Sequence, residues 1–347
     1  MKYKQLSLAI TAMLAAVAEA NKIDQTVVSK GYNIEPVAVQ NMYDEITKSI
    51  DFLSKINVIG KDEKVGQVIG LSVGLVGSNT DTTQSGSKRE ARPIHSLSGR
   101  EYRLEQTNFD VALRYAEIDK WAHLTDFPAR INGQIAKAIA LSLITAGMNG
   151  TRRAKNSDSQ TNPLLQDLAV GWLQKIRTEN TTRVMGWEVG AVGTTKKAVK
   201  YGKAAPDYKN LDAIVTDAIN NLMDERFAGR TDFVVCTSRR TVGDKYTSLI
   251  NQAGETATET EAAARLNKER TLGGLPVVFV SNMPANTLLI TPLENLSIYY
   301  QTGGERRTIK DNPERDQLES YQSKNIDFIV EEYGACALIE NLEHTPT

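Results

Sequence analysis

The sequence predicts an α+β protein built around one long helix, and three observations support this prediction. Apolar and small residues recur with helical spacing over residues 127–150. Two alternating runs around a polar tip, within residues 60–115, are typical of a long β-hairpin. From residue 288 to residue 339 the chain is dominated by short extended runs. With 347 residues, 41% hydrophobic and 24% charged, it is long enough for a large core and two domains.

The N-terminal twenty residues contain a diluted apolar stretch after two lysines. The larger apolar residues of this stretch fall on one helical face, which predicts an amphipathic helix that needs a partner surface: they are Leu6, Ile10, Met13, Leu14 and Val17. The end Ala18-Glu19-Ala20 also fits a signal-peptidase site, so secretion stays open as an alternative. A polar connection leads to a second helix predicted over residues 37–56.

The chain that follows has the pattern of an arm. Apolar residues alternate over residues 65–75 and again over residues 102–115, and residues 79–92 between them are too polar to pack. An isolated hairpin is marginal in water, so this one should lie on another subunit.

The long helix has clear start and end signals. Asp126 is placed to cap it, and Pro128 suits the first turn, where a missing N–H costs nothing. Gly147 and Gly150 weaken and then end it. We expect its two apolar stripes to be buried between the C-terminal strands and the extended arm, with Lys137 at a solvent edge.

Mixed segments after the long helix predict a compact α/β domain over residues 162–284. Its expected parts are helices over residues 164–177, 211–223 and 239–250, strands over 233–236 and 272–280, a Gly- and Lys-rich loop over 185–208, and a low-complexity segment over 252–268.

The remainder is strand-dominated and offers the natural surface for the long helix to cover. Strands are predicted over residues 288–290, 296–300, 306–309, 326–330 and 335–339. Gly303-Gly304 predicts a hairpin turn between the second and third of these.

Composition supports neither a metalloprotein nor a globally basic protein that coats nucleic acid. The formal net charge of −1 excludes a globally basic nucleic-acid coat. Cys236 and Cys336 lie far apart, each in an apolar run, which indicates buried, reduced thiols. The histidines have no cysteine or carboxylate at metal-ligand spacing, so neither a metal nor a cofactor is predicted; they are His95, His123 and His344.

No catalytic residues are predicted either. The sequence contains no GxSxG elbow, no HExxH and no cysteine with a plausible histidine partner. The acidic pair Glu331-Glu332 is interpreted as a solvated face, and the pairs Arg306-Arg307 and Arg239-Arg240 as intersubunit or surface charges.

Six ordered segments together identify a resemblance that covers nearly the whole chain. They are IDFLSKINVI from residue 50, YAEIDKWAHLTDFPARI from 115, AGMNGTRRAKNSD from 146, NPLLQDLAVGWLQKIR from 162, LENLSIYY from 293 and DNPERDQLESYQSKNIDFIVEEY from 311. The chain resembles the major capsid proteins of contractile-tailed temperate phages of the peduovirus type. The match is weakest over residues 186–207 and 252–268.

The resemblance implies the tailed-phage coat-protein fold and a structural role in an icosahedral double-stranded DNA phage head. By it, residues 1–54 are an N-terminal arm, 55–110 an extended loop, 111–161 and 285–347 a peripheral domain with a long spine helix, and 162–284 an axial domain.

The resemblance also implies partners and a place of action. The subunits are expected to form pentamers and hexamers, guided by an internal scaffold with protease activity, with a portal protein at one vertex. Packaged double-stranded DNA is expected on the inner surface without sequence specificity, and no membrane partner is expected. Assembly is expected in the host cytoplasm and the final location is the virion.

Two sets of residues become candidate functional sites. By similarity the scaffold protease cuts near Lys30, Gly31, Tyr32 and Asn33, which gives the N-terminal helix a second explanation as a scaffold-facing assembly segment. At the hairpin tip, three cationic residues are candidates for contact with acidic groups of a neighbouring subunit: they are Lys88, Arg89 and Arg92.

Two other functions stay open. A shell protein of a cellular compartment would use the same fold, and a secreted or periplasmic α/β binding protein would explain the signal-like N-terminus. A portal and scaffold encoded nearby would argue against the first, and electron microscopy of purified material separates the second from either shell protein.

Overall fold

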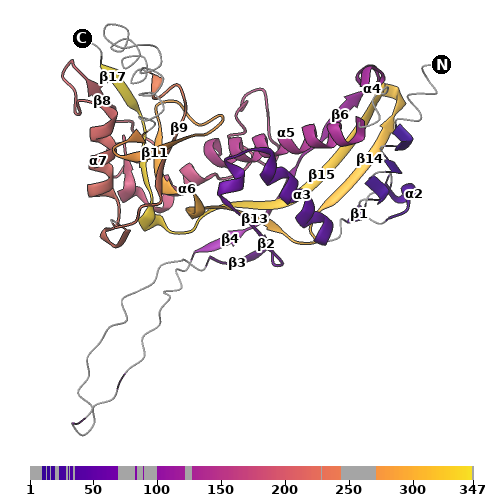
Figure 1. The fold of residues 1–347 in the computed structure, drawn as a ribbon, viewed down its shortest axis with the longest axis horizontal. Helices are drawn as coiled ribbons and strands as arrows, with labels where there is room; N and C mark the ends of the chain where they lie inside the picture. Colours follow the sequence, from indigo (N-terminus) through magenta and orange to yellow (C-terminus); the bar gives the residue numbers. More distant parts are fainter. Residues whose placement is uncertain are drawn as a thin grey trace, which may run out of the picture.

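Two mixed sheets lie next to each other along the long axis of the molecule in this computed structural model, and helix α5 (Phe127–Asn149) runs along the larger one (Figure 1). The structure describes residues 10–12, 14–15, 17–19, 23–28, 30, 32–33, 36–68, 83, 89, 100–121, 127–227, 229–243 and 271–345.

The larger sheet is organised around one long strand, β15. Its first half pairs with β14 and β6 and its second half with β13 and β5, all antiparallel. Strand β2 adds in parallel to β13, and β1 adds antiparallel to β14. The strands are β1 (Tyr32–Asn33), β2 (Asn57–Lys61), β5 (Glu105–Asn108), β6 (Val111–Arg114), β13 (Leu296–Gln301), β14 (Arg306–Asn312) and β15 (Gln317–Val330).

This pairing corrects the predicted turn at Gly303-Gly304. Strands β13 and β14 both pair with β15 and are not hairpin partners. The hairpin is formed by β14 and β15, through a 3-10 turn (Pro313–Arg315) and Asp316, whose φ of 51° is left-handed. The glycine pair indicates a turn in the chain, but it does not say which strands pair. Strand β15 is long enough to pair with both β13 and β14, so these two strands do not pair with each other.

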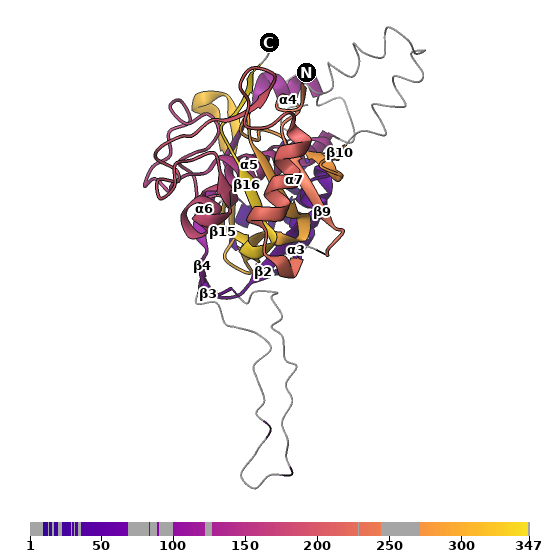
Figure 2. The same ribbon diagram turned by 90° about the vertical axis from the view of Figure 1, so that its left-hand side faces the viewer.

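The smaller sheet has its own core. Its order is β10-β11-β9-β12-β16-β7, and α7 (Leu211–Leu222) packs on it (Figure 2) with Asn210 accepting a hydrogen bond from the Ala213 N–H as N-cap. The strands are β7 (Val184–Met185), β9 (Phe233–Thr237), β10 (Thr271–Leu272), β11 (Leu275–Phe279), β12 (Leu288–Pro292) and β16 (Ala337–Ile339). Because β12 and β16 belong to it, this sheet extends beyond residues 162–284.

Helix α5 is as long as predicted, and its apolar face is buried. Ile135 and Ile139 are 7% and 4% exposed, whereas Lys137 is exposed. In the second stripe Ile144 and Met148 are buried, but Leu141 is 40% exposed. The main cover is α3 (Pro36–Ser49), a helix of the predicted N-terminal arm. The expected cover by the extended arm concerns residues that lie largely outside the described ones.

Helix α6 (Trp172–Glu179) begins eight residues later than predicted. The chain before it folds back on itself: the Thr151 N–H donates to the Gln166 carbonyl and the Gly171 N–H to the Gly150 carbonyl. Leu165 has a left-handed φ of 58°, which a helix does not allow. The apolar residues before α6 have helical spacing, but they therefore belong to a packed loop and not to a helix.

Helix α6 also connects the two sheets through ion pairs. The Lys175 ammonium lies 2.8 Å from the carboxylate of Asp327 in β15. The Arg177 guanidinium lies 2.5 Å from the carboxylate of Glu340, just after β16. All four side chains are largely buried, so these pairs hold the sheets in a fixed relation.

The predicted loop over residues 185–208 contains a strand. Strand β8 (Val199–Gly202) pairs in parallel with β17 (Leu342–Thr345), which comes from the C-terminal end of the chain. A second small pair, β3 (Val65–Gln67) and β4 (Glu101–Arg103), is antiparallel and forms the base of the predicted hairpin. The remaining helical segments are α2 (Gln25–Val28), α4 (Tyr115–Trp121) and the 3-10 turns Leu53–Lys55, Thr181–Arg183, Glu225–Phe227, Leu293–Asn295 and Tyr333–Ala335.

Several predictions fall outside the described residues. They are the cap at Asp126, most of the hairpin tip over 79–92, the helix over 239–250 beyond residue 243, the low-complexity segment over 252–268, and any account of Gly31, Lys88, Arg92, His95 and His123.

Candidate functional site

The base of the hairpin has a small apolar core of its own. Val68, Tyr102 and Leu104 from the hairpin pack with Tyr299 of β13 and Ile329 of β15, and all five are buried. This contact holds the base of the hairpin arm against the larger sheet.

Gly66 permits the close packing of this base. It lies opposite Tyr102 in the β3–β4 pair, and a Cβ at Gly66 would come within 2.5 Å of the Tyr102 hydroxyl oxygen. A side chain at this position would push the ring away from Tyr299, whose ring meets that of Tyr102 edge to face at 5.3 Å.

Two cations hold the two ends of the hairpin to the sheet. On the outgoing side, the Lys61 ammonium lies 4.6 Å from the centre of the Tyr299 ring and 5.8 Å from that of Tyr102. On the returning side, Arg100 donates to the carbonyl oxygens of Val330, at 2.7 Å, and Glu331, at 2.5 Å, and its guanidinium covers the Tyr333 ring at 4.7 Å.

Glu331 is part of this base, which corrects its interpretation as a solvated residue. Its side chain is buried at 3% exposure and accepts a hydrogen bond from the Tyr299 hydroxyl at 2.9 Å. Burial, with the nearby Glu331 carboxylate, raises the pKa of Tyr299, so the hydroxyl remains a donor. We name Lys61, Arg100, Tyr299 and Glu331 the hairpin clamp.

The N-terminal segment, residues 10–33, is the second candidate site. Its described residues between 10 and 19 are helical, as predicted. Val17, Ala18, Val28 and Tyr32 are buried in the main core, so the partner surface of the amphipathic helix is the chain's own body. Strand β1 and α2 lie beside β14 at one end of the larger sheet (Figure 1).

The candidate processing residues differ in environment. Lys30 is exposed in a turn, whereas Tyr32 is 8% exposed and lies directly opposite Arg307 in the β1–β14 pair. Asn33 pairs with Arg306, and Gly31 is outside the described residues.

Three charged side chains gather beneath this segment. Glu305 and Lys324 are each 1% exposed, with 3.9 Å between carboxylate oxygen and ammonium nitrogen. Burial raises the pKa of Glu305, lowers that of Lys324 to about 8 and lowers that of Arg307. Arg307 is half-buried, with its Nε inaccessible to water, whereas its neighbour Arg306 is exposed. We name Glu305, Arg307 and Lys324 the charge cluster.

Of the candidate contacts at the hairpin tip, the structure describes only Arg89, which is exposed. Lys88 and Arg92 lie outside the described residues, and their grouping with Arg89 stays a prediction.

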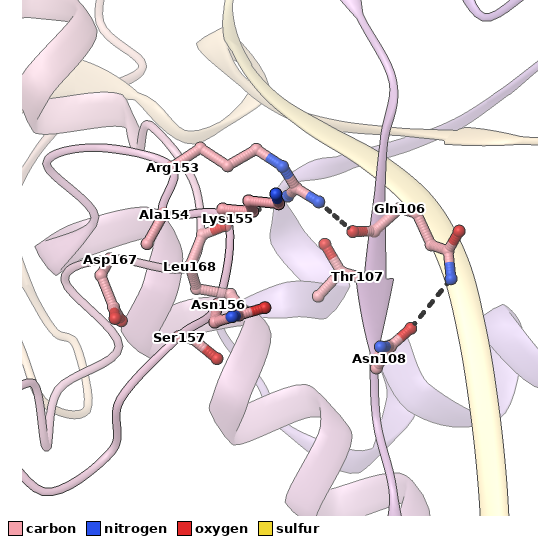
Figure 3. A pocket seen from close by; sticks show the side chains of 10 residues that line it. All are labelled: Gln106, Thr107, Asn108, Arg153, Ala154, Lys155, Asn156, Ser157, Asp167 and Leu168. Carbon is pink, nitrogen blue, oxygen red and sulfur yellow. Dashed lines mark hydrogen bonds between the residues drawn. The ribbon is translucent and has the colours of Figure 1, made fainter.

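A polar cavity of about 310 Å³ lies between the 150–171 loop and β5 (Figure 3). Arg153, which lines it, pairs with Glu105 and donates to the carbonyl oxygens of Gln106 and Leu168. Asp167 is buried and accepts from the Asp158 N–H at 2.8 Å. Since the guanidinium is used to hold the loop to the strand, we interpret this cavity as a structural joint.

Cys236 and Cys336 are buried and not disulfide-bonded, and burial raises the pKa of each thiol to about 12. No group of three or more metal-ligating side chains occurs among the described residues, and within them no helix has the length and apolar character to cross a membrane.

The clamp and the cluster could not be found from the sequence. The clamp residues are spread over residues 61–331 and the cluster residues over residues 305–324, and all are ordinary residue types with no shared spacing. Gly66 opposite the aromatic residue Tyr102 could have indicated the close packing at the hairpin base. Recognising this pair, however, requires the strand register to be known first.

Residues 9–342 match the family model described as phage major capsid protein, P2 family. The chain is 42% identical over 334 residues to the capsid proteins of Escherichia phage P2, covering 96% of this chain and 93% of that protein. It is 35% identical to the major capsid protein of Serratia phage KSP20, covering 94% and 93%.

A solved structure is similar as well. A chain of the satellite phage P4 procapsid, determined with the size determination (Sid) protein, superposes with a TM-score of 0.81 at 40% identity. The similarity covers 92% of this chain and 96% of that one.

Proposed function

The chain belongs to the P2 family of phage major capsid proteins and is a structural subunit of the virion shell, and we propose that its copies assemble into pentamers and hexamers on an internal scaffold. It is not an enzyme. Family membership decides against the two alternatives that the sequence left open, a cellular compartment shell and a secreted binding protein.

The hairpin clamp is the observation that supports this proposal best. A capsid subunit has to aim its extended loop at a neighbour, and the clamp fixes the direction in which that loop leaves the body. Aromatic packing, two cation–ring contacts and a buried hydrogen bond at one point make the base stiff. Residues 55–110 then act as the extended loop that lies over a neighbouring subunit.

The remaining domains are proposed on the same basis. The α5 helix and the larger sheet serve as the peripheral domain, from residues 111–161 and 285–347. Residues 162–284, with the smaller sheet, serve as the axial domain around five- and six-fold positions, although β12 and β16 of that sheet come from outside the range.

We propose that the hairpin tip makes charge-dependent contacts through Lys88, Arg89 and Arg92. Charged rims chiefly govern association rate and partner choice. Reversing all three to Glu should slow shell assembly at low salt and leave the circular dichroism of the subunit unchanged, while the triple Gln variant should lie between. Assembly that is equally fast in all three proteins, followed by light scattering, argues against this role.

We propose that residues near Lys30–Asn33 are cut by a scaffold-associated protease during assembly in the host cytoplasm. The exposed turn at Lys30 supports this location. N-terminal sequencing of protein from mature shells should begin between Gly31 and Ile34. Mature shells that retain the N-terminal helix would contradict it.

The other partners are proposed from family membership. They are a portal protein at one vertex and packaged double-stranded DNA on the inner surface, bound without sequence specificity. Electron microscopy of particles from cells that express the chain with and without its scaffold tests the assembly proposal: regular shells are expected only with the scaffold, and unassociated subunits in both cases contradict it.

A further inference from the structure

A second polar cavity, of about 290 Å³, lies beside the base of the hairpin, and its charged side chains are all cationic. Lys64 comes from the turn between β2 and β3, and Arg306 from the start of β14. No carboxylate is among the described side chains that line the cavity, so it carries two positive charges and no negative one. Its neutral side chains are those of Gln106, Gln301, Ser323 and Asn325.

The strand register brings these side chains to one face of the larger sheet. Arg306 lies opposite Ser323 in the β14–β15 pair, and Gln106 lies opposite Asn325 in the β5–β15 pair. Residues that face each other across strands share a face, and so do residues two apart on one strand. Ile326, on the alternate face of β15, packs in the main core. The cavity is therefore on the face of β15 that points away from this core.

Two amide side chains form a fixed wall of the cavity. Asn325, which is 9% exposed, donates from Nδ2 to Oε1 of Gln301 at 2.6 Å, and Gln301 donates from Nε2 to the Asp62 carbonyl at 3.2 Å. The backbone lies directly against this pair, since a Cβ at Gly304 would come within 2.6 Å of the Gln301 Oε1. Each amide nitrogen carries a second N–H, so the wall can donate to a further acceptor.

The two cations of the cavity are not neutralised by the acids of the same region. Neither Lys64 nor Arg306 has an ion pair with a described residue. Glu105 is paired with Arg153, and the Asp62 carboxylate accepts from a threonine hydroxyl. A concave site lined by one sign of charge concentrates its electric field on a ligand of opposite charge. The cavity therefore has the chemistry of an anion site.

We propose that this cavity binds one carboxylate of an acidic side chain that belongs to a second copy of this chain. The guanidinium of Arg306 can donate two parallel hydrogen bonds to a carboxylate, and Lys64 adds a second charge. A single carboxylate suits the cavity better than the phosphates of DNA, because Asp62 and Glu63 are exposed beside Lys64 and repel an extended polyanion.

The choice of a second copy as the partner rests on the proposed function. Copies surround one another in a shell, and the cavity lies where the hairpin leaves the body toward a neighbouring subunit. Lys64 belongs to the chain that leads into the hairpin and Gln106 to the strand that returns from it.

The first test uses the unassembled full-length subunit and glutarate, a free dicarboxylate. The backbone amide signals of Gly303 and Gly304 should shift to saturation in nuclear magnetic resonance titrations. The double variant Lys64→Gln with Arg306→Gln should bind glutarate roughly tenfold more weakly or not at all. Lys310→Gln removes an exposed cation from the same strand outside the cavity, and should bind as the parent chain does. Absent shifts in the parent chain, or equal affinities in all three proteins, overturn the proposal.

A titration with inorganic phosphate at the same ionic strength tests the class of anion. Phosphate should bind no more tightly than glutarate. Clearly tighter binding of phosphate would overturn the assignment of a carboxylate and point to a nucleic-acid backbone as the ligand.

The second test identifies the partner in shells assembled from equal amounts of unlabelled and heavy-isotope-labelled subunits. A carbodiimide joins a lysine amine to a carboxylate in contact with it, forming an amide with loss of water. Mass spectrometry of mixed-isotope peptide pairs separates links between copies from links within one chain. We expect Lys64 to be joined to an Asp or Glu of another copy. Links of Lys64 only within its own chain, or only to the scaffold, overturn the proposal.

Failure of this inference and failure of the proposed function give different results. If no regular shells form with the scaffold, the proposed function fails, and the glutarate titration still decides whether the site exists. If shells form but Lys64 makes no link between copies, the function stands and the inference fails.

Discussion

The indole ring of Trp172 lies against Gly147 so closely that a Cβ on this glycine would come within 2.3 Å of the ring carbon Cζ3. Trp172 is completely buried, donates from Nε1 to the Ser297 carbonyl at 3.0 Å, and meets the Phe328 ring edge to face at 5.1 Å. Gly147, which the sequence predicts as a weak point of the long helix, is thus the notch in α5 into which α6 packs.

Gly147→Ala should destabilise the subunit by about 1 to 3 kcal/mol, because the new methyl group overlaps a ring that has no room to move. Gly133→Ala in the same helix is the matched control, since a Cβ at Gly133 meets nothing within 4 Å. It should be neutral or stabilising by up to about 1 kcal/mol. Urea unfolding of the unassembled subunit measures the stability of both variants. Equal free energies of unfolding for the two variants would contradict the close packing of Trp172 on Gly147.

Ile139→Asp should give insoluble or unassembled protein. Ile139 is 4% exposed on the face of α5 that lies in the main core, and an unpaired carboxylate there should cost at least several kcal/mol. Lys137→Gln, two residues away on the exposed side, should stay within about 0.5 kcal/mol of the parent chain. Solubility and particle yield decide: if both variants assemble equally well, α5 is not a buried spine.

Tyr299→Phe should weaken the hairpin clamp. It removes the hydroxyl that donates to the buried Glu331 carboxylate, which should cost about 1 to 3 kcal/mol. Tyr102→Phe is the control, because Tyr102 lies in the same small core and its ring, which this change keeps, makes the contact with Tyr299. We expect a lower particle yield for Tyr299→Phe alone. Equal particle yields and equal unfolding curves for the two variants would falsify the role of the Tyr299 hydroxyl in the clamp.

The charge cluster predicts a pH dependence of stability. Burial lowers the pKa of Lys324 from 10.5 to about 8, so between these values the unfolded chain binds more protons than the folded one. The free energy of unfolding therefore gains a contribution that rises with pH across this window, of about 1 to 3 kcal/mol.

The double variant Glu305→Gln with Lys324→Met lacks this contribution. Between pH 8 and 10 the parent chain should gain stability relative to the double variant, measured by urea unfolding at each pH. Other titrating groups are common to both proteins and cancel in the difference. Parallel pH profiles contradict the assignment of a buried, charged Lys324.

The sequence by itself determined the elements whose signals are local. Helical spacing over residues 127–150 predicted α5 to within a residue of its end, and apolar alternation predicted the strands of the C-terminal region. It also indicated the burial of Cys236 and Cys336, and six ordered segments identified the family. These features depend on side-chain periodicity and on residue identity, which are written in the chain one position after another.

Only the tertiary structure decided which distant segments meet. The pairing of β13 and β14 with β15 rather than with each other, the strand β8 inside a predicted loop, and the loop before Trp172 all depend on partners far away in the chain. Glu331 looks like a surface charge in the sequence, and folding buries it because its carboxylate meets the Tyr299 hydroxyl at the hairpin base. The physical reason is that solvent exposure and hydrogen-bond partners are set by the packing of several segments at once, which no local pattern contains.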